Sequence, residues 1–158
     1  MSTVPLTKHG AELLKQELHR LKTRERHDVI AAIAEARSHG DLSENAEYDA
    51  AKERQSFIEG RIAELEGKIS SAQIIDPSTL DAEGRVVFAS TVDLDDLETG
   101  ERVTYQIVGE DEADLKENKV SITSPIARAL IGKYSGDVVA VKAPVGDREY
   151  EVIDVRYI

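Results

Sequence analysis

The sequence predicts an α+β protein: an N-terminal antiparallel coiled-coil hairpin of two helices, followed by a small antiparallel sheet with one short helix. Two observations predict this fold class. Apolar residues with helical spacing form narrow stripes over residues 8–38 and 46–69. After Pro77 this spacing stops, and short β-branched segments alternate with turn residues. We therefore expect a hairpin domain over residues 1–76 and a sheet domain over residues 77–158.

The first helix is expected to begin at Lys8, where the hydroxyl of Thr7 can cap the free backbone N–H groups. A charged stretch over residues 22–28 divides its apolar residues into two groups, but it contains no proline or glycine that would break the helix. One helix is therefore expected from about residue 8 to about residue 38. Its apolar face is expected to consist of Ala11, Leu14, Leu18, Leu21, Val29, Ile30, Ile33 and Ala36.

A tight turn is expected to join the two helices. Gly40 suits the left-handed conformation that follows a helix C-terminus. Asp41, with Glu44 three residues later, matches a capping box that starts the second helix, although Ser43 fits the N-cap position equally well. Because the connection is short, the helices should run antiparallel and pack along their stripes. About thirty residues at about 1.5 Å each give an arm on the order of 45 Å long, which is too thin to enclose a core and should project into solvent or a partner.

The sheet domain is expected to contain five strands and one short helix. Ser124 followed by Pro125 predicts the start of the helix, because serine caps helices and proline favours the first helical position. Gly132 predicts its end. The segment Pro144–Asp147 predicts a hairpin turn between the last two strands. The expected strands span residues 85–92, 101–108, 119–123, 137–142 and 148–157.

Composition and charge argue against several classes of function. The chain has no cysteine, and its four histidines show no metal-ligand spacing, so a metal would have to bind carboxylates. The net charge of −11 arises mainly from residues 76–158, where 18 acidic residues face 9 lysines and arginines. This balance argues against a protein that binds naked nucleic acid by itself and favours a protein partner. No apolar run reaches the length of a membrane span and the N-terminus lacks a secretory signal, so we expect a cytoplasmic protein without a membrane partner.

Three segments resemble the GreA/GreB transcript-cleavage factors of bacterial RNA polymerase. They are AIAEARSHGDLSENAEYDAAKE at residues 32–53, IVGEDEAD at residues 107–114 and SPIARALIGKYSGDVVAV at residues 124–141. The resemblance implies an FKBP-like C-terminal domain that holds the rim of the polymerase secondary channel while the hairpin enters it. The function that it implies is stimulation of the polymerase's own Mg²⁺-dependent cleavage of backtracked RNA at the 3′ end. Ser43 beside the acidic pair and the few basic residues near the tip favour the GreA type over the GreB type.

The resemblance also implies which residues form the sites. The acidic pair of the family falls on Asp41 and Glu44, as catalytic and metal-binding residues inside the polymerase complex, with Ser43 as a helper. The basic pair that contacts the extruded RNA falls on Arg37 and Lys52. The residues implied to bind the polymerase are Ser124, Pro125, Ile126, Ala127 and Arg128.

Two carboxylates on a solvated turn suit a weak magnesium site. Mg²⁺ takes oxygen ligands, keeps several waters and is usually held by one or two carboxylates together with substrate phosphates. Residues 37–54 carry five acids against three lysines and arginines, so RNA and polymerase carboxylates repel the tip unless a cation lies between them. The hypothesis is that Asp41 binds the second Mg²⁺ of a two-metal site shared with the polymerase, and that Glu44 binds or orients the attacking water as general base. The protein would then be no enzyme by itself and would hold no metal tightly alone.

Simpler explanations exist for the same residues. Asp41 and Glu44 can serve only as a helix cap, and Arg37 and Lys52 can be ordinary exposed helix residues. Tyr48 is expected to pack on the turn with Leu42, and Ile126, Leu130 and Ile131 are expected in the core.

Three other functions also remain open. A factor of the same shape can inhibit the polymerase from the channel without promoting cleavage, although it would not need the acidic pair. An FKBP-like prolyl isomerase or chaperone requires a dense aromatic pocket, and the sheet domain has few aromatic residues. A plain coiled-coil scaffold predicts self-association along the seam, whereas we expect a monomer.

Overall fold

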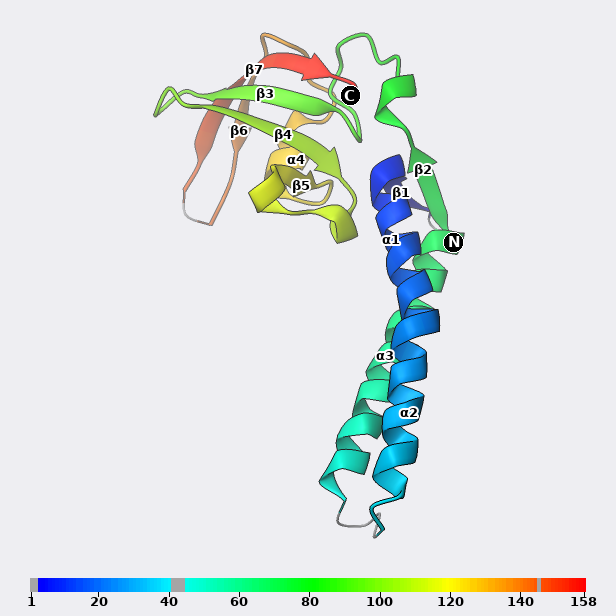
Figure 1. Ribbon diagram of the computed structural model, residues 1–158. Helices are drawn as coiled ribbons and strands as arrows, with labels where there is room; N and C mark the ends of the chain where they lie inside the picture. The colour runs from blue at the N-terminus through cyan, green and yellow to red at the C-terminus, as the bar shows by residue number, and fades with distance from the viewer. Residues whose placement is uncertain (1–2, 41–44, 145) are drawn as a thin grey trace. The chain divides into compact units, whose positions relative to one another are not determined.

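The computed structural model describes residues 3–40, 45–144 and 146–158 (Figure 1). It contains two compact units, one formed by residues 11–72 and the other by residues 3–10 together with 73–158. Residues 3–10 therefore belong with the sheet unit. The division at residue 76 that we expected from the sequence places them with the hairpin instead. Within the described ranges, no helix is long and apolar enough to cross a membrane.

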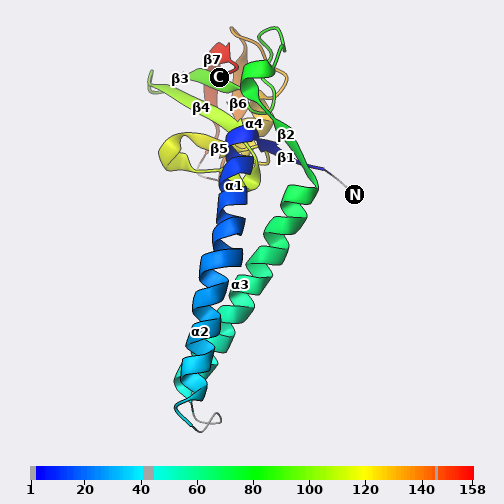
Figure 2. The same ribbon diagram turned by 45° about the vertical axis from the view of Figure 1, so that its right-hand side comes forward.

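The first unit is a hairpin of two long helical segments, as the sequence predicts (Figure 2). The outgoing segment consists of α1 (Lys8–Arg20), the π-helical segment η1 (Leu21–Glu25) and α2 (Arg26–Arg37), and the returning segment is α3 (Ala46–Ser70). Their buried apolar side chains form one seam between the helices. The seam comprises Ala11, Leu14, Leu21, Val29, Ile33 and Ala36 from the outgoing segment and Ala51, Ile58, Ile62 and Leu65 from α3.

The π-helical segment η1 is the main departure from the single uninterrupted α-helix that the sequence predicts. Continuing the spacing of Leu14, Leu18 and Leu21 in an α-helix would place Glu25 and Asp28 on the seam. A π-helical turn holds about one residue more than an α-helical turn, so it shifts every later residue by one position. Val29 therefore reaches the seam and is fully buried, while Asp28 is exposed. The charged stretch at residues 22–28 is thus accommodated without a break in the helix.

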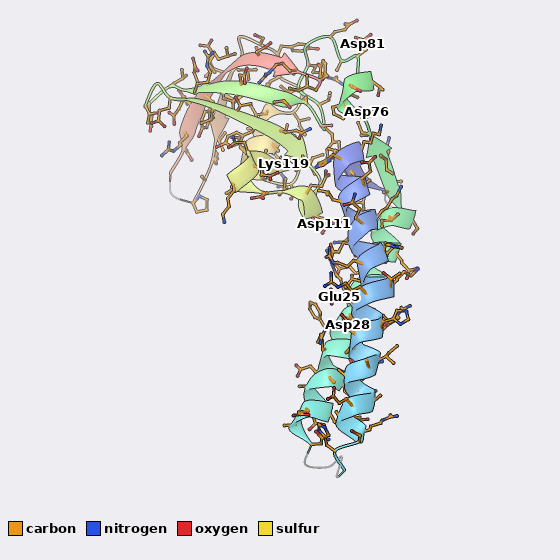
Figure 3. The ribbon with its side chains drawn as sticks, in the orientation of Figure 1. Glu25, Asp28, Asp76, Asp81, Asp111 and Lys119 are labelled. Carbon is orange, nitrogen blue, oxygen red and sulfur yellow. The ribbon has the colours of Figure 1, made fainter. Side chains whose placement is uncertain are left out.

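Ion pairs between the two helices flank the seam. The guanidinium of Arg26 donates to both carboxylate oxygens of Glu59, at 2.9 and 2.7 Å. Arg61 binds Glu17 in the same two-pronged way, at 2.8 and 3.0 Å. Glu25, which Figure 3 labels on η1, lies 3.7 Å from Arg54 of α3. Because exposed pairs contribute only about 0.2–1 kcal/mol each, their main effect is to fix the register of the helices.

The end of the hairpin is fastened by Asn45. Gly40 follows α2 with φ of +104°, which confirms the predicted left-handed position. The Asn45 side-chain oxygen caps α3 by accepting from the Tyr48 N–H at 3.0 Å, and its amide nitrogen donates to the Ala36 carbonyl at 2.6 Å. The cap expected at Asp41 or Ser43 is therefore wrong. Asparagine caps helices as well as aspartate does, and only its amide also supplies the donor that reaches α2.

The second unit contains a five-stranded sheet in the order β5-β4-β3-β7-β6 (Figure 1). All neighbours run antiparallel except β4 and β5, which run parallel, so the sheet is mixed rather than purely antiparallel as expected. The chain returns from β4 to β5 through two short 3₁₀ turns, η3 (Glu110–Glu112) and η4 (Leu115–Glu117). The strands are β3 (Thr91–Asp96), β4 (Arg102–Val108), β5 (Lys119–Ser121), β6 (Val138–Val141) and β7 (Arg148–Arg156).

The strand expected over residues 85–92 is largely wrong. Only its last two residues belong to β3, which continues to Asp96. Ala89 has a φ of +75°, and the buried Ser90 hydroxyl donates to the Val87 carbonyl at 2.6 Å, so the backbone bends there. Val86 is fully buried, and its backbone exchanges hydrogen bonds with residues 132 and 133. Arg85 and Tyr134 form an isolated antiparallel bridge here, so the β-branched run marks a segment buried in the core with one bridge and not a strand of the five-stranded sheet.

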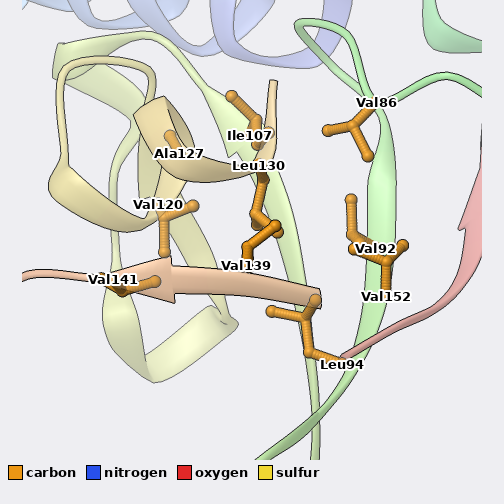
Figure 4. Close-up of a cluster of buried hydrophobic side chains, with 10 residues drawn as sticks. All are labelled: Val86, Val92, Leu94, Ile107, Val120, Ala127, Leu130, Val139, Val141 and Val152. Carbon is orange, nitrogen blue, oxygen red and sulfur yellow. The ribbon is translucent and has the colours of Figure 1, made fainter. Parts of the chain in front are cut away.

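The core of the second unit lies between the sheet and α4 (Pro125–Leu130), as Figure 4 shows. Ser124 caps α4 by accepting from the Ala127 N–H at 3.2 Å, and Gly132 follows with φ of +89°, so both ends of this helix are confirmed. The predicted turn at residues 144–147 joins the antiparallel strands β6 and β7, although its Val145 lies outside the described residues. The buried cluster comprises Val86, Val92, Leu94, Ile107, Val120, Ala127, Leu130, Val139, Val141 and Val152.

The turn between β3 and β4 is organised by one buried carboxylate. Asp96 accepts from the backbone N–H groups of Glu98 and Thr99, at 2.9 and 3.3 Å, and from Arg148 of β7 at 2.8 Å. These hydrogen bonds, the one from the Glu98 backbone first, lower the pKa of Asp96 below its usual value. The charged carboxylate thus stabilises the folded turn.

The N-terminal residues of the second unit form a strand that the sequence did not predict. β1 (Val4–Thr7) pairs with β2 (Ala72–Ile75) in a separate two-stranded sheet. The Thr7 hydroxyl caps α1 by accepting from the Gly10 N–H at 3.0 Å, as predicted. Glu112 accepts hydrogen bonds from the Thr7 backbone at 3.1 Å, from the Thr7 hydroxyl and from the Gly109 backbone at 2.9 Å. This carboxylate therefore joins the start of the chain to η3.

Candidate functional site

The acidic residues implied as the catalytic pair, Asp41 and Glu44, and their helper Ser43 lie outside the described residues. Their immediate neighbours are described. Gly40 follows α2 after a short turn, and Asn45 caps α3 while its amide nitrogen donates to the Ala36 carbonyl of α2. The two helices are thus bound directly to each other at the base of the four-residue connection.

The start of α3 bears on the simpler explanation for the acidic pair. A capping box places its two residues at the N-cap and three positions into the helix. Because α3 begins at Ala46 and is capped by Asn45, Asp41 and Glu44 do not occupy those two positions. The capping role weighed against a catalytic role is therefore excluded for this helix.

The basic residues implied to contact RNA come together on the hairpin. Arg37 lies in the last turn of α2 and Lys52 in the second turn of α3, and both are exposed. Both line one groove of about 260 Å³ between the helices, which we call the α2–α3 groove. Its lining consists of Ile30, Ile33, Ala34, Arg37, Lys52 and Gln55.

Each basic side chain in the groove has a neighbour that limits its movement. The Arg37 guanidinium lies over the ring of Tyr48, 5.9 Å from the ring centre, in a cation–π contact. Lys52 donates from Nζ to the side-chain oxygen of Gln55 at 3.2 Å. The expected partner of Tyr48, Leu42, lies outside the described residues, and the contact with Arg37 was not foreseen. Both positive charges are thus presented at the rim of the same groove.

Further charged groups surround the tip. Glu47 and Asp49 occupy the first turn of α3, where the positive end of the helix dipole favours acidic side chains. Glu47 also pairs with His39, whose Nδ1 lies 3.0 Å from the Glu47 carboxylate. Within the part of the chain that the structure describes, no three histidine, aspartate or glutamate side chains are grouped as metal ligands.

The five residues implied to bind the polymerase differ in what they present. Ser124 serves as the cap of α4, and Ala127 is fully buried in the core. Ile126 is half-buried against the same core, as expected. Pro125 is exposed at the start of α4, and Arg128 is exposed in its last turn. A partner on this surface would therefore contact these last two residues, while the first three hold the helix in place.

The sequence interpretation missed three features of the hairpin that bear on function. Asn45 stands immediately before an alanine-rich helical run, which is a recognisable N-cap signal. Ile30 was expected on the apolar face, which is wrong, because its side chain is 51% exposed. Val29 and Ile33 already face the seam, and Ile30 is about 100° of helical rotation from Val29. Gln55 is an ordinary polar helix residue in the sequence and gains interest only from its place in the groove.

Comparison with known proteins agrees with this arrangement. Residues 4–74 match the family model described as "Transcription elongation factor, N-terminal", and residues 81–157 match "Transcription elongation factor, GreA/GreB, C-term". The chain is 68% identical over 158 residues to "Transcription elongation factor GreA" of Ralstonia nicotianae, with all of both chains covered. It is also 68% identical to the protein of the same name from Neisseria meningitidis, again over the whole of both chains.

Among solved structures, the chain is 33% identical to GreA factor homolog 1 of Thermus thermophilus, with 98% of this chain and 99% of that chain covered and a TM-score of 0.43. The two family models together cover nearly the whole chain. The chain therefore belongs to the GreA/GreB family of transcription elongation factors.

Proposed function

We propose that this elongation factor inserts its hairpin into the secondary channel of bacterial RNA polymerase and stimulates the polymerase's own cleavage of backtracked RNA. The observation that carries the proposal is the cap of α3. Because Asn45 supplies the cap and also binds Ala36, the fold of the tip uses neither carboxylate of the acidic pair for that purpose. We infer that Asp41 and Glu44 serve the chemistry instead, next to two helices that Asn45 binds to each other.

The donor set at the tip fits Mg²⁺. Asp41 and Glu44 offer hard carboxylate oxygens, which this ion prefers, and two carboxylates are too few to hold it without further ligands from the polymerase and the RNA. When bound there, the ion would supply Lewis-acid stabilisation of the charge that develops on the phosphate. Asp41 would hold it, Glu44 would orient the attacking water and accept its proton, and Ser43 would assist by hydrogen bonding. The factor would thus complete an active site and would be no enzyme by itself.

Arg37 and Lys52 would hold the phosphates of the extruded RNA. Their positive charges lie together at the rim of the α2–α3 groove, on an otherwise acidic tip. The cation–π contact with Tyr48 lowers the number of conformations open to Arg37, so less entropy is lost when it binds a phosphate. The sheet unit would bind the polymerase through the surface around Pro125 and Arg128. We further propose that the factor acts as a cytoplasmic monomer.

The proposal is tested with a stalled, backtracked transcription complex, Mg²⁺ and the purified protein. Wild-type protein should release short RNA fragments from the 3′ end. Asp41→Asn or Glu44→Gln should lower the stimulated rate about 100-fold or more, as expected for loss of a metal ligand or a general base, with polymerase affinity unchanged. Glu47→Gln is the matched control, because Glu47 is an exposed acid of the same tip that pairs with His39.

Two results would contradict the proposal. If the variants lose polymerase affinity in parallel with cleavage, the acidic pair serves docking rather than chemistry. If wild-type protein binds the polymerase and slows elongation without releasing fragments, the protein is an inhibitor that occupies the channel.

A further inference from the structure

We propose that the α2–α3 groove seats one nucleobase of the extruded RNA, so that the hairpin holds a base as well as the phosphates. This inference rests on the proposed function and adds the part of the substrate that the groove recognises. The groove combines an apolar wall, two cations and one amide within about 260 Å³. Single-stranded nucleotides have this combination of groups: an apolar base face, an anionic phosphate and a polar base edge.

The apolar wall is the first part of the argument. Ile30 is 51% exposed on α2, although it is a large apolar residue. It contributes nothing to the seam, because Val29 beside it is already fully buried there. Ile30 and the exposed Ala34 lie one turn apart on the same face of α2, above the buried Ile33. Together they form an apolar surface that a base face can cover, with the branched Ile30 side chain nearly fixed in one rotamer.

The polar rim is the second part of the argument. Arg37 and Lys52 attract a phosphate to the edge of the apolar wall, and neither is buried. Gln55 accepts from Lys52 through its side-chain oxygen, which directs the amide oxygen to the lysine and leaves the NH₂ group as a donor for the groove. Single-stranded RNA is read by such hydrogen bonds to base edges. The positive charges of Arg37 and Lys52 at the rim favour an anionic ligand over an apolar peptide segment.

The groove makes a prediction about RNA position. The base that contacts Ile30 must belong to a nucleotide whose neighbour in the RNA lies near the end of the hairpin. The contribution of the groove to the cleavage rate should therefore depend on the base at one particular position of the extruded strand. An abasic nucleotide at that position keeps the phosphate but removes the apolar contact. Wild-type protein should lose about five-fold in cleavage rate at limiting factor concentration when that one base is removed, as expected for about 1 kcal/mol of buried apolar surface.

The test combines the abasic series with the variant Ile30→Ala. On intact RNA, Ile30→Ala should also lower the rate about five-fold; on RNA that is abasic at the seated position, it should have no further effect, because the contact is already gone. Leu13→Ala is the matched control, because Leu13 is 49% exposed on α1 and lies outside the groove. Melting curves of both variants verify that each hairpin folds. Gln55→Ala should change the order of cleavage rates among RNAs that carry different bases at the seated position.

Several results would overturn the inference. If Ile30→Ala behaves as wild type, or if it lowers the rate equally on intact and abasic RNA, Ile30 does not contact the base. If Ile30→Ala instead weakens polymerase binding without any RNA, the groove docks a protein segment.

A second readout separates this inference from the proposed function. 4-Thiouridine at the seated position should cross-link to the peptide that contains Ile30, and Ile30→Ala should reduce that cross-link several-fold. A cross-link without stimulated cleavage would support the groove and contradict the cleavage function. Cleavage without the cross-link would do the reverse.

Discussion

Replacing Asn45 by alanine is expected to destabilise the end of the hairpin, because one side chain makes two hydrogen bonds there. The side-chain oxygen accepts from the Tyr48 N–H at 3.0 Å, and the amide nitrogen donates to the Ala36 carbonyl at 2.6 Å. Loss of an N-cap costs about 1 kcal/mol, and loss of one further hydrogen bond costs about 1 kcal/mol. Asn45→Ala should therefore lower the free energy of unfolding by about 2 kcal/mol.

Two further variants separate the two bonds. Asn45→Ser keeps an oxygen that can cap α3 but is too short to reach Ala36, so it should cost about 1 kcal/mol. Asn45→Asp also keeps the cap, but it places a carboxylate oxygen where the amide donated to the Ala36 carbonyl, so it should be less stable than wild type despite its favourable interaction with the helix dipole. Aspartate and asparagine are otherwise equivalent caps, which makes this comparison specific for the donor.

The assay is urea unfolding followed by far-UV circular dichroism, which mainly reports the helices of the hairpin. The midpoint should fall in the order wild type, Asn45→Ser, Asn45→Ala, with the slope of the transition unchanged. A cost below about 0.5 kcal/mol for Asn45→Ala, or equal costs for the serine and alanine variants, would refute the assignment of two separate bonds to Asn45.

Three other predictions follow from the fold. Deletion of Thr23 should be tolerated, because it converts the π-helical turn η1 into an α-helical turn and preserves the seam. Deletion of Ala31 should instead rotate Ile33 and Ala36 off the seam and greatly lower the helix content measured by circular dichroism. Gly60→Ala should stabilise the protein by about 1 kcal/mol and raise its melting temperature, since the added carbon meets no side chain and no backbone beyond its own helix within 4 Å. Gly10→Ala should lower the melting temperature, because the added carbon would lie 1.8 Å from the Glu112 carboxylate. Because the pKa of Asp96 is lowered in the folded state, its charge stabilises the protein above about pH 4, and this stabilisation is lost as the pH falls through the folded-state pKa. Asp96→Asn should therefore weaken the dependence of the urea midpoint on acid pH. An unchanged pH profile would show that the carboxylate charge does not stabilise the turn.

Sequence patterns predicted those parts of the fold in which one local signal decides the structure. Thr7 and Ser124 cap the helices that follow them, and Gly40 and Gly132 end helices with positive φ, because each of these residues acts on its own neighbours. The hairpin itself follows from two stripes of apolar residues, which need no knowledge of distant parts of the chain.

The parts of the fold that the sequence did not predict depend on contacts between residues that are far apart in the sequence. The π-helical turn η1 arises because the seam of α3 requires Val29 rather than Asp28, and no residue in η1 marks it. The run around Val86 has the composition of a strand, but its backbone pairs with residues 132 and 133, which are adjacent only in the folded unit. At the candidate site, the family resemblance implied that Arg37 and Lys52 act together. The place of Ile30 in the groove could not be predicted, because it depends on whether Val29 or Ile30 faces the seam.

The place of β1 has a consequence for the order in which this protein can fold during synthesis. Leu6 is fully buried, and the Thr7 backbone and hydroxyl bind Glu112, so these residues pack with a part of the chain that is made about a hundred positions later. The two helices of the hairpin and β2, which follows them directly, are made before Glu112, so the hairpin can form while Thr7 still lacks this partner. Completion of the sheet unit then waits for the last part of the chain. A short extension or truncation at the N-terminus should therefore affect the stability of the C-terminal sheet more than that of the hairpin next to it in sequence.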